Sequence, residues 1–429
     1  MAAKAPSKQS HLRLKSHYLR RFPNTVNCLG EWKRYRDGYW QRVEEGQVRK
    51  EMLETLVAYS NGLPITRNVL SSVYALTQAD TFLPGDTFDS DIDLLAFNDR
   101  TLKISTGETR PNAPEDYVTS KLPFNYAPEI HSDLWQRVLA STEAEYVPFI
   151  QEYAGYCLTP STRHELALWC WGDPGSGKST FIAGLEAMLG ARCCTLGLAD
   201  IERSNFALAQ IPGKTLAIST EQPSRFIRSS HILNSLISGE SLSWERKFVD
   251  PITIRPHVKL VWAMNELPRI DSSGVGLFRR VVPIPWRKVE KPDPKVKDAV
   301  YGIGQAVFNW AFEGLKRLNE RGHFDIPAGL IAEREAYRTQ NDIPLVFVED
   351  ACLRCEVLDE SGNYNKTQSA HLYHAYRNWC QSTGHKSLSS TAFAAEMKRL
   401  GFERVRIDGR SYFIGILLKP NGNDDAVIM

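Results

Sequence analysis

A glycine-rich stretch, WCWGDPGSGKSTF at residues 169–181, holds the residue types best suited to bind a phosphate. Gly172, Gly177, Lys178 and Ser179 fit the pattern G-x-x-x-x-G-K-[ST]. In this pattern the glycines let backbone N–H groups turn toward phosphate oxygens, the lysine reaches the β- and γ-phosphates, and the hydroxyl is a ligand of Mg²⁺. We expect the loop that binds the cofactors ATP and Mg²⁺ to consist of Gly172, Asp173, Pro174, Gly175, Ser176, Gly177, Lys178, Ser179 and Thr180.

Apolar residues on both sides of this stretch predict the elements that must position it. LALWCW, at residues 166–171, has the composition of a buried strand. After the loop, apolar residues recur on one face of a helix, and Gly190 is the expected end of that helix. The residues of this face are Phe181, Ile182, Leu185, Met188 and Leu189. Strand, loop and helix in this order place the phosphate at a helix N-terminus, which favours an anion.

Two downstream strands are predicted to end in polar residues. KTLAISTEQ (214–222) ends near Glu221, which is placed to act as a hydrolytic base or as a second, water-mediated partner of Mg²⁺ beside Ser179. VKLVWAMNELP (258–268) ends near Asn265, which is placed to orient the attacking water. Each residue alone is also compatible with a simple strand-end turn.

A fourth predicted strand begins with a pair of arginines. In GLFRRVVPIPW (276–286), Arg279 and Arg280 stand where a side chain can reach the nucleotide of a neighbouring subunit. About 40 residues separate Lys178 from Glu221, and about 40 more separate Glu221 from Asn265; the arginines follow. This order and spacing resemble those of the superfamily 3 helicases, a branch of the AAA+ ATPases. Within that branch the chain is most similar to the phage/plasmid and poxvirus primase-helicase group. The resemblance implies a hexameric ring with ATP sites between subunits.

The resemblance extends to a segment between Glu221 and Asn265. HILNSLISGESLSWERKFVDPITIRPHVKL (231–260) looks like the family's β-hairpin, which enters the central pore. The resemblance implies that Arg246 and Lys247 lie at or near this hairpin and grip the DNA backbone.

The resemblance also covers both ends of the chain. Residues 94–126 are similar to the domain that precedes the ATPase in these proteins, and the tail looks like their C-terminal winged-helix region. The predicted fold class is α/β: an AAA+ P-loop ATPase core with an N-terminal α+β domain and a C-terminal winged-helix-like domain. The expected domains are an N-terminal α+β domain (1–130), the ATPase core (131–290), a helical linker or lid (291–342) and the winged-helix-like domain (343–429).

The tail carries a possible DNA surface. Ser389 or Ser390 is expected to cap the helix TAFAAEMKRL, and Asp408-Gly409 to form the turn of a two-stranded wing. The DNA-contacting residues expected here are Lys398, Arg399 and Arg406. A solvated basic rim would have the same charges.

Shorter patterns predict elements before residue 160. A hairpin with Asp37-Gly38 as its turn should precede a helix that ends near residue 58, and a second hairpin should span residues 94–105. Asp89, Asp91 and Asp93 are interpreted as a polar turn before that second hairpin. A primase-type acidic pair is the alternative. Residues 132–158 are predicted to be helical.

Cysteine and histidine residues of the tail do not predict zinc. Cys352 and Cys355 form one C-x-x-C pair, and the H-x-x-H spacing of His371 and His374 is shorter than that of usual zinc sites. The surrounding residues, Leu372, Tyr373, Tyr376 and Trp379, instead form the apolar face of a core helix.

Composition limits the class of protein. Hydrophobic residues make up 42% and charged residues 24%, the net charge is +2, and the eight cysteines follow no disulfide framework. No apolar stretch long enough for a membrane span and no secretion signal is seen, so we expect a cytoplasmic protein that does not contact membranes.

These observations predict an ATP-hydrolysing, ring-forming DNA helicase for the replication of a phage, plasmid or other mobile element. Its expected partners are single-stranded and forked DNA, further copies of itself in a hexameric homo-oligomer, and a separate primase or polymerase. Two alternatives are a nucleotide-gated replication initiator or regulator without processive unwinding, and a bifunctional primase-helicase that uses Asp91 and Asp93.

Overall fold

The computed structural model divides into two compact units, which are described separately below. It describes residues 8–60, 64–203, 205–222, 227, 230–246, 249–270, 275–359 and 361–420. The first unit comprises Met1–Ser224, Ile232–Glu266 and Ile284–Pro327, and the second Arg225–His231, Leu267–Pro283 and Ala328–Met429. The finer domain boundaries expected from the sequence remain predictions.

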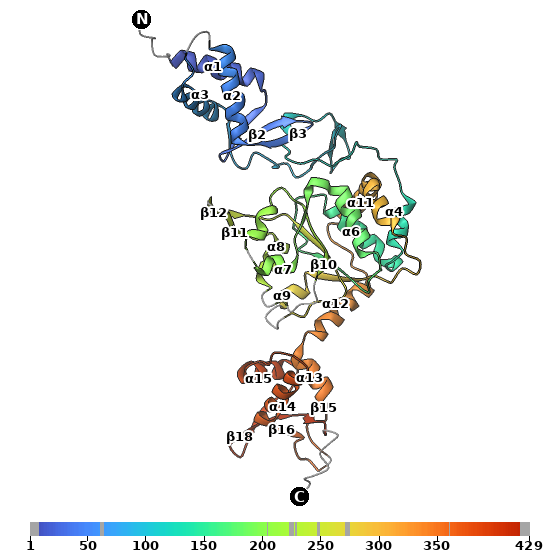
Figure 1. Cartoon of the computed structure of the whole chain (residues 1–429). Helices are drawn as coiled ribbons and strands as arrows, with labels where there is room; N and C mark the ends of the chain where they lie inside the picture. Colours follow the sequence, from blue (N-terminus) through green and yellow to red (C-terminus); the bar gives the residue numbers. More distant parts are fainter. Residues whose placement is uncertain are drawn as a thin grey trace. The chain divides into compact units, whose positions relative to one another are not determined.

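The N-terminal part of the first unit packs three helices near a four-stranded sheet (Figure 1). The helices are α1 (Lys8–Arg21), α2 (Glu45–Tyr59) and α3 (Arg67–Asp80). The sheet has the order β3 (Tyr39–Val43), β2 (Glu31–Arg36), β1 (Thr25–Cys28) and β4 (Phe82–Leu83). Its core is formed by Leu14, Tyr18, Trp32, Val48, Met52, Leu56, Val69 and Val73. The predicted Asp37-Gly38 turn is confirmed, because Asp37 (φ 51°) and Gly38 (φ 86°) both adopt the left-handed conformation of a tight hairpin turn.

The second predicted hairpin is also confirmed. Strands β5 (Leu94–Ala96) and β6 (Thr101–Lys103) pair antiparallel, and β7 (Thr109–Arg110) extends this sheet. The acidic residues before it hold turns: Asp89 Oδ1 accepts a hydrogen bond from Thr119 N (2.8 Å), and Asp93 Oδ1 accepts one from Ser105 N (2.8 Å). This placement confirms the polar-turn interpretation of the aspartates.

A five-stranded sheet forms the centre of the first unit. Its order is β14 (Val281–Pro285), β8 (Ala167–Trp171), β13 (Lys259–Met264), β10 (Leu216–Gln222) and β9 (Cys193–Thr195). The pairs β8–β13, β13–β10 and β10–β9 are parallel. The strands read as continuous apolar runs because parallel sheets are covered on both faces. The mixed α/β core expected from the sequence is therefore present.

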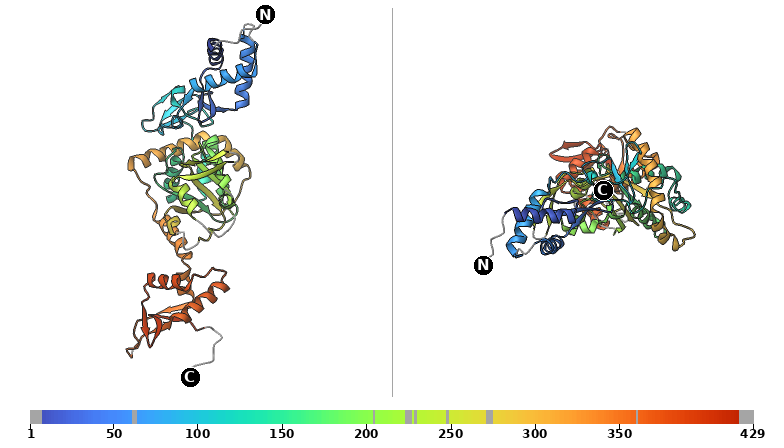
Figure 2. Two further views of the ribbon diagram at one scale, coloured as in Figure 1. Left: turned by 90° about the vertical axis from the view of Figure 1, so that its left-hand side faces the viewer. Right: turned by 90° about the horizontal axis from the view of Figure 1, so that it is seen from above.

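Helices cover this sheet. Helix α6 (Lys178–Leu189) packs on β10 and β13, and α11 (Gly304–Arg321) packs against α5 (Val147–Tyr156) and α6 (Figure 1; Figure 2). The predicted apolar face of α6 is confirmed, since all five residues named for it are at most 1% exposed. Gly190 ends the helix at φ 52°, as expected.

The helix predicted over residues 132–158 is interrupted. It consists of α4 (Asp133–Leu139) and α5, separated by a short 3₁₀ turn. Pro148 lies in the first turn of α5, where its missing N–H is not needed.

Shorter elements complete the unit. They are α7 (Leu198–Arg203), α8 (His231–Ser238), the antiparallel hairpin β11 (Leu242–Arg246) and β12 (Val249–Ile254), and α10 (Lys295–Val300). Helix α10 begins within KVEKPDPKVKD (288–298), a charged stretch with two prolines that follows β14. No helix in the described part of the chain is long and apolar enough to cross a membrane.

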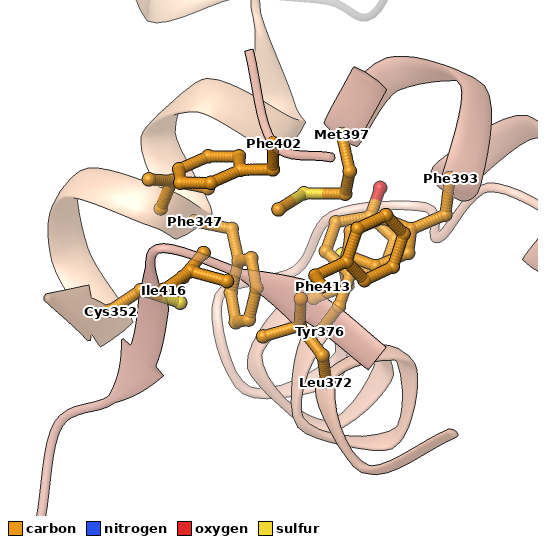
Figure 3. Close-up of a cluster of buried hydrophobic side chains, with 11 residues drawn as sticks. Phe347, Cys352, Leu372, Tyr376, Phe393, Met397, Phe402, Phe413 and Ile416 are labelled. Carbon is orange, nitrogen blue, oxygen red and sulfur yellow. The ribbon is translucent and has the colours of Figure 1, made fainter. Parts of the chain in front are cut away.

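The second unit contains a compact helical and β core (Figure 3). Its elements are α9 (Val275–Phe278), α12 (Ala328–Gln340), α13 (Ile343–Ala351), β15 (Cys352–Arg354), β16 (Lys366–Gln368), α14 (Ser369–Ser382), α15 (Ser390–Arg399), β17 (Arg404–Ile407), β18 (Arg410–Ile414) and β19 (Ile416–Leu418). The buried cluster includes Phe347, Cys352, Leu372, Tyr376, Phe393, Met397, Phe402, Phe413 and Ile416. Cys352 is thus a core residue. Among the described residues, no group of three or more His, Cys, Asp or Glu side chains is arranged to hold a metal ion.

Local signals in this unit are confirmed. The Ser389 side chain accepts a hydrogen bond from Ala392 N (3.3 Å) and caps α15. Asp408 and Gly409 form the turn between β17 and β18. The sequence therefore predicts the small elements of the tail well, because their caps and turns are local.

Candidate active site

The carboxyl ends of three neighbouring strands bring the predicted site residues together. The glycine-rich loop follows β8, Glu221 lies near the end of β10, and Asn265 directly follows β13. Because these strands are parallel and β13 lies between the other two, their carboxyl ends share one edge of the sheet. This is the edge at which open α/β sheets bind ligands.

The glycines of the loop are required by its backbone conformation. Gly172 (φ 141°), Gly175 (φ 81°) and Gly177 (φ 83°) all have positive φ. A Cβ atom at Gly172 would lie 2.2 Å from the carbonyl oxygen of Trp286, so that position has no room for a side chain. Trp286 N also donates to Trp171 O (2.8 Å), which holds the segment after β14 against the base of the loop.

Lys178 is held by the loop that it terminates. Its side chain is buried, and Nζ donates to Gly172 O (2.6 Å), Asp173 O (2.9 Å) and Ser176 Oγ (2.9 Å). Burial lowers the pKa of Lys178, and Asp173 acts in the opposite direction. The charge of Asp173 raises this pKa, and its backbone carbonyl accepts one of the hydrogen bonds from Nζ.

A cavity of 330 Å³ lies over the loop. Residues of the loop and the first turn of α6 form one side of it, and the ends of β10 and β13 form the other. Its lining residues are Pro174, Gly175, Ser176, Gly177, Lys178, Ser179, Thr180, Thr220, Glu221, Ala263, Met264 and Asn265. The structure therefore places four residues with predicted chemical roles, Lys178, Ser179, Glu221 and Asn265, around one cavity.

Few of the side chains that line this cavity carry an oxygen atom placed to be a ligand of Mg²⁺. Ser179 Oγ donates to Thr220 O (3.5 Å), next to Glu221, whose side chain is exposed. Mg²⁺ retains several waters and is usually held by one or two carboxylates together with substrate phosphates. One hydroxyl and one carboxylate fit a Mg²⁺ ion that arrives with a nucleotide, and fit poorly an ion bound by protein alone.

Three lining residues of this edge, Thr220, Ala263 and Met264, were not predicted as site residues. Thr220 and Met264 line the cavity because each lies next to a predicted residue at a strand end. The sequence signal that could have identified these two residues is their position directly before Glu221 and Asn265.

The predicted arginines differ in exposure. They are the two residues before β14 and belong to the second unit. Arg279 is exposed, whereas Arg280 is only 8% exposed and donates from Nη1 to Gly276 O (3.1 Å). A side chain that acts on a neighbouring subunit must be reachable, which favours Arg279.

The predicted DNA-contacting residues lie on separate elements. Arg246 is the last residue of β11 and pairs with Val249, and Lys247 lies outside the described residues. In the second unit, Lys398 is exposed at the end of α15, and Arg406 is exposed on β17.

Arg399 has a different environment. It forms ion pairs with Asp342 (2.6 Å) and Glu396 (2.5 Å). Two carboxylates already compensate its charge, so any phosphate would compete with them.

Three regions of the chain match known families. Residues 12–142 match "D5 N terminal like", residues 170–280 match a "Family of unknown function (DUF5906)", and residues 340–413 match "Poxvirus D5 protein-like". The first and third matches support a relationship to D5-like replication proteins. No curated protein matches the chain in sequence.

Solved structures of one protein share the fold. "The A form apo structure of NrS-1 C terminal region-CTR" is 12% identical with a TM-score of 0.54, and covers 94% of this chain and 97% of its own. "The apo structure of NrS-1 C terminal region (305-718)" is 11% identical with a TM-score of 0.53, over 96% of this chain and 100% of its own. At these identities the likeness concerns the fold.

Proposed function

We propose that this protein is an ATP-dependent DNA helicase that assembles into a ring and serves the replication of a phage, plasmid or other mobile element. The observation that carries the proposal is the arrangement of Lys178, Ser179, Glu221 and Asn265 around one cavity over the glycine-rich loop. The D5-like matches at both ends of the chain support the replication role. In this proposal the protein acts in the cytoplasm on single-stranded and forked DNA, beside a separate primase or polymerase.

Each residue around the cavity has a distinct proposed role. The loop N–H groups and Lys178 bind the phosphates, and Ser179 contributes a ligand to the Mg²⁺ ion that neutralises phosphate charge. Glu221 accepts a proton from the attacking water, and Asn265 orients that water. Both side chains are exposed at the cavity, which leaves them accessible to a bound nucleotide.

The small number of cations at the cavity supports the proposed ring. Among the lining residues that the structure describes, Lys178 is the only cation, whereas stabilising a γ-phosphate in the transition state commonly takes a second cation supplied in trans. We propose Arg279 of a neighbouring subunit for this role. In the same proposal the core is of the AAA+ type, the β11–β12 hairpin lines the pore, and the tail is a winged-helix domain that contacts DNA through Lys398 and Arg406.

Strand displacement tests the function directly. Wild-type protein should separate a forked DNA in an ATP-dependent manner, and Lys178→Ala should not, because the lysine that reaches the phosphates is missing. Lys316→Ala, which removes an exposed lysine of α11, is the matched control and should unwind like wild type.

The alternative outcome separates the helicase from an initiator. Wild type that hydrolyses ATP and binds DNA, yet never separates strands alone or with a primase, would refute the helicase proposal. That result would favour a nucleotide-gated initiator.

A further inference from the structure

A second cavity, also of 330 Å³, lies at the opposite edge of the central sheet. Arg192 directly precedes β9, Thr215 directly precedes β10, and His257 lies shortly before β13. Because these three strands are parallel, their starts share the edge that is opposite the glycine-rich loop. The cavity is therefore separate from the candidate active site, and its volume is within the range of small-molecule sites.

Two buried side chains of this cavity have unused hydrogen-bonding atoms. Arg192 is 6% exposed, and its Nη2 donates to Leu158 O (2.9 Å). Its Nε, and the Oγ1 of Thr215, which is 3% exposed, have no hydrogen-bond partner among the described residues. Leaving a buried polar atom unsatisfied costs about 1–3 kcal/mol, and more for a charged group, so such atoms usually have a partner. A ligand in the cavity would supply one after a shift of these covered side chains.

The lining of the cavity also carries cations. Lys214 and Arg255 line it as well as Arg192. Lys214 Nζ donates to Ala191 O (2.5 Å), which holds the lysine close to the Arg192 segment. Burial lowers the pKa of Arg192 to about 10, which leaves the guanidinium charged at neutral pH. Three cations and a hydroxyl are the donors that a phosphate group requires.

A second part of the lining, the Asp89–Ile92 wall, comes from the N-terminal part of the same unit, and the carboxylate of Asp89 is close enough to raise the pKa of Arg192 against the effect of burial. Its carboxylates, Asp89 and Asp91, stand beside the apolar side chains of Phe88 and Ile92. A carboxylate has about four lone-pair sites, so Asp89 can accept further hydrogen bonds beyond those from Thr119. Carboxylates repel a phosphate but accept sugar hydroxyls, and an apolar surface accommodates a base.

We propose that this cavity binds a nucleotide, with the phosphate on Arg192, Lys214 and Thr215 and the sugar and base against the Asp89–Ile92 wall. The ligand chemistry is a phosphate joined to a hydroxyl-bearing sugar. A free nucleoside monophosphate satisfies both walls, because its phosphate and its sugar hydroxyls are all exposed. The site does not depend on ATP hydrolysis at the glycine-rich loop.

Calorimetric titration of the Lys178→Ala protein with AMP tests the proposal, since that background removes the phosphate-reaching lysine of the other cavity. We expect saturable binding that Lys214→Gln or Thr215→Val, added to this background, weakens by about tenfold, the effect of one hydrogen bond to a charged group. Thr215→Val keeps the shape of the side chain and removes only the hydroxyl. Lys316→Gln makes the same charge change on exposed α11 and should leave AMP affinity unchanged.

Further titrants identify the source of the phosphate. Inorganic phosphate should bind more weakly than AMP, because it makes no contact with the sugar wall. A single-stranded oligothymidylate that displaces AMP would assign the phosphate to a DNA strand and overturn the free-nucleotide proposal. Absence of AMP binding in the Lys178→Ala protein, or AMP binding that neither Lys214→Gln nor Thr215→Val weakens, would also overturn it.

Discussion

Ser179 Oγ lies 3.5 Å from the carbonyl oxygen of Thr220, the residue before Glu221. This hydrogen bond joins the first turn of α6 to the end of β10. It therefore couples the position of the phosphate-binding helix to the strand end that carries the proposed base.

Glu221→Gln should abolish hydrolysis while ATP still binds. A general base contributes about 10²–10⁴-fold to rate, and glutamine retains the size of the side chain without accepting the proton. Phosphate release and binding of a fluorescent ATP analogue measure the two properties. Glu290→Gln, an exposed residue after β14, is the matched control, and hydrolysis retained by Glu221→Gln would refute its role as base.

Arg279→Ala should impair ATP hydrolysis, whereas Arg280→Ala should impair stability. Arg279 is exposed, so its loss should leave the thermal midpoint nearly unchanged and abolish ATP hydrolysis by the assembled protein. Arg280 is buried, so its loss should lower the free energy of unfolding by about 1–3 kcal/mol.

Subunit mixing shows whether Arg279 acts across an interface. Lys178→Ala and Arg279→Ala proteins are each inactive at their own sites but retain the complementary residue. A mixture should regain part of the wild-type hydrolysis. No recovery, in a mixture shown to co-assemble, would contradict a shared site.

Gly172→Ala should be more damaging than Gly175→Ala. Both positions have positive φ, which costs an alanine about 1–2 kcal/mol. Only at Gly172 does the new Cβ also collide with backbone, at 2.2 Å from Trp286 O, whereas Gly175 faces open space. Urea unfolding should rank Gly172→Ala as the less stable protein, and equal losses would refute the steric argument.

The thermal midpoint should depend on pH through Lys259. This lysine is buried, its Nζ donates to His257 O (3.0 Å) and Ser161 O (3.3 Å), and burial lowers its pKa to about 7. The unfolded pKa is about 10.4, so between these values the unfolded chain binds a proton that the folded chain lacks. The contribution of Lys259 to stability should therefore be lost as pH falls from about 10.4 to about 7 and change little below that.

Comparison with Lys259→Met isolates this effect. The midpoint of the wild type relative to the variant should rise between pH 7 and pH 9.5. Parallel curves for the two proteins over this range would show that the lysine does not titrate there.

The double variant Arg246→Ala, Lys247→Ala should uncouple hydrolysis from unwinding. Two fewer phosphate contacts should reduce the slope of log affinity against log salt on single-stranded DNA by about 1.4. Strand displacement should be lost while appreciable ATP hydrolysis remains. An unchanged salt slope would remove these residues from the DNA contact.

The sequence predicts the local parts of the site because their signals are local. The apolar run of β8, the spacing of Phe181 and Leu185 on α6, and the turn at Asp37-Gly38 each depend on residues within a few positions. Parallel strands then bring Glu221 and Asn265 to the loop, since the carboxyl ends of neighbouring strands meet.

The features of the site and of the tail that the sequence does not predict depend on contacts between residues far apart in the chain. The collision that reserves position 172 for glycine comes from Trp286, and the partner of Arg399 is Asp342. Neither pairing has a sequence signal. The difference between Arg279 and Arg280 likewise appears only when their exposure is known.

The three hydrogen bonds from Lys178 to its own loop have a consequence for when the protein responds to nucleotide. Two backbone carbonyls and the Ser176 hydroxyl occupy the same ammonium group that a phosphate must recruit. The loop thus contains its own competitor for the lysine, and a phosphate that recruits Lys178 must displace these hydrogen bonds. If the proposed function holds, Ser176→Ala should weaken the competitor and lower the nucleotide concentration at which the site fills, so that the loop itself would set a threshold for the response to cellular energy supply.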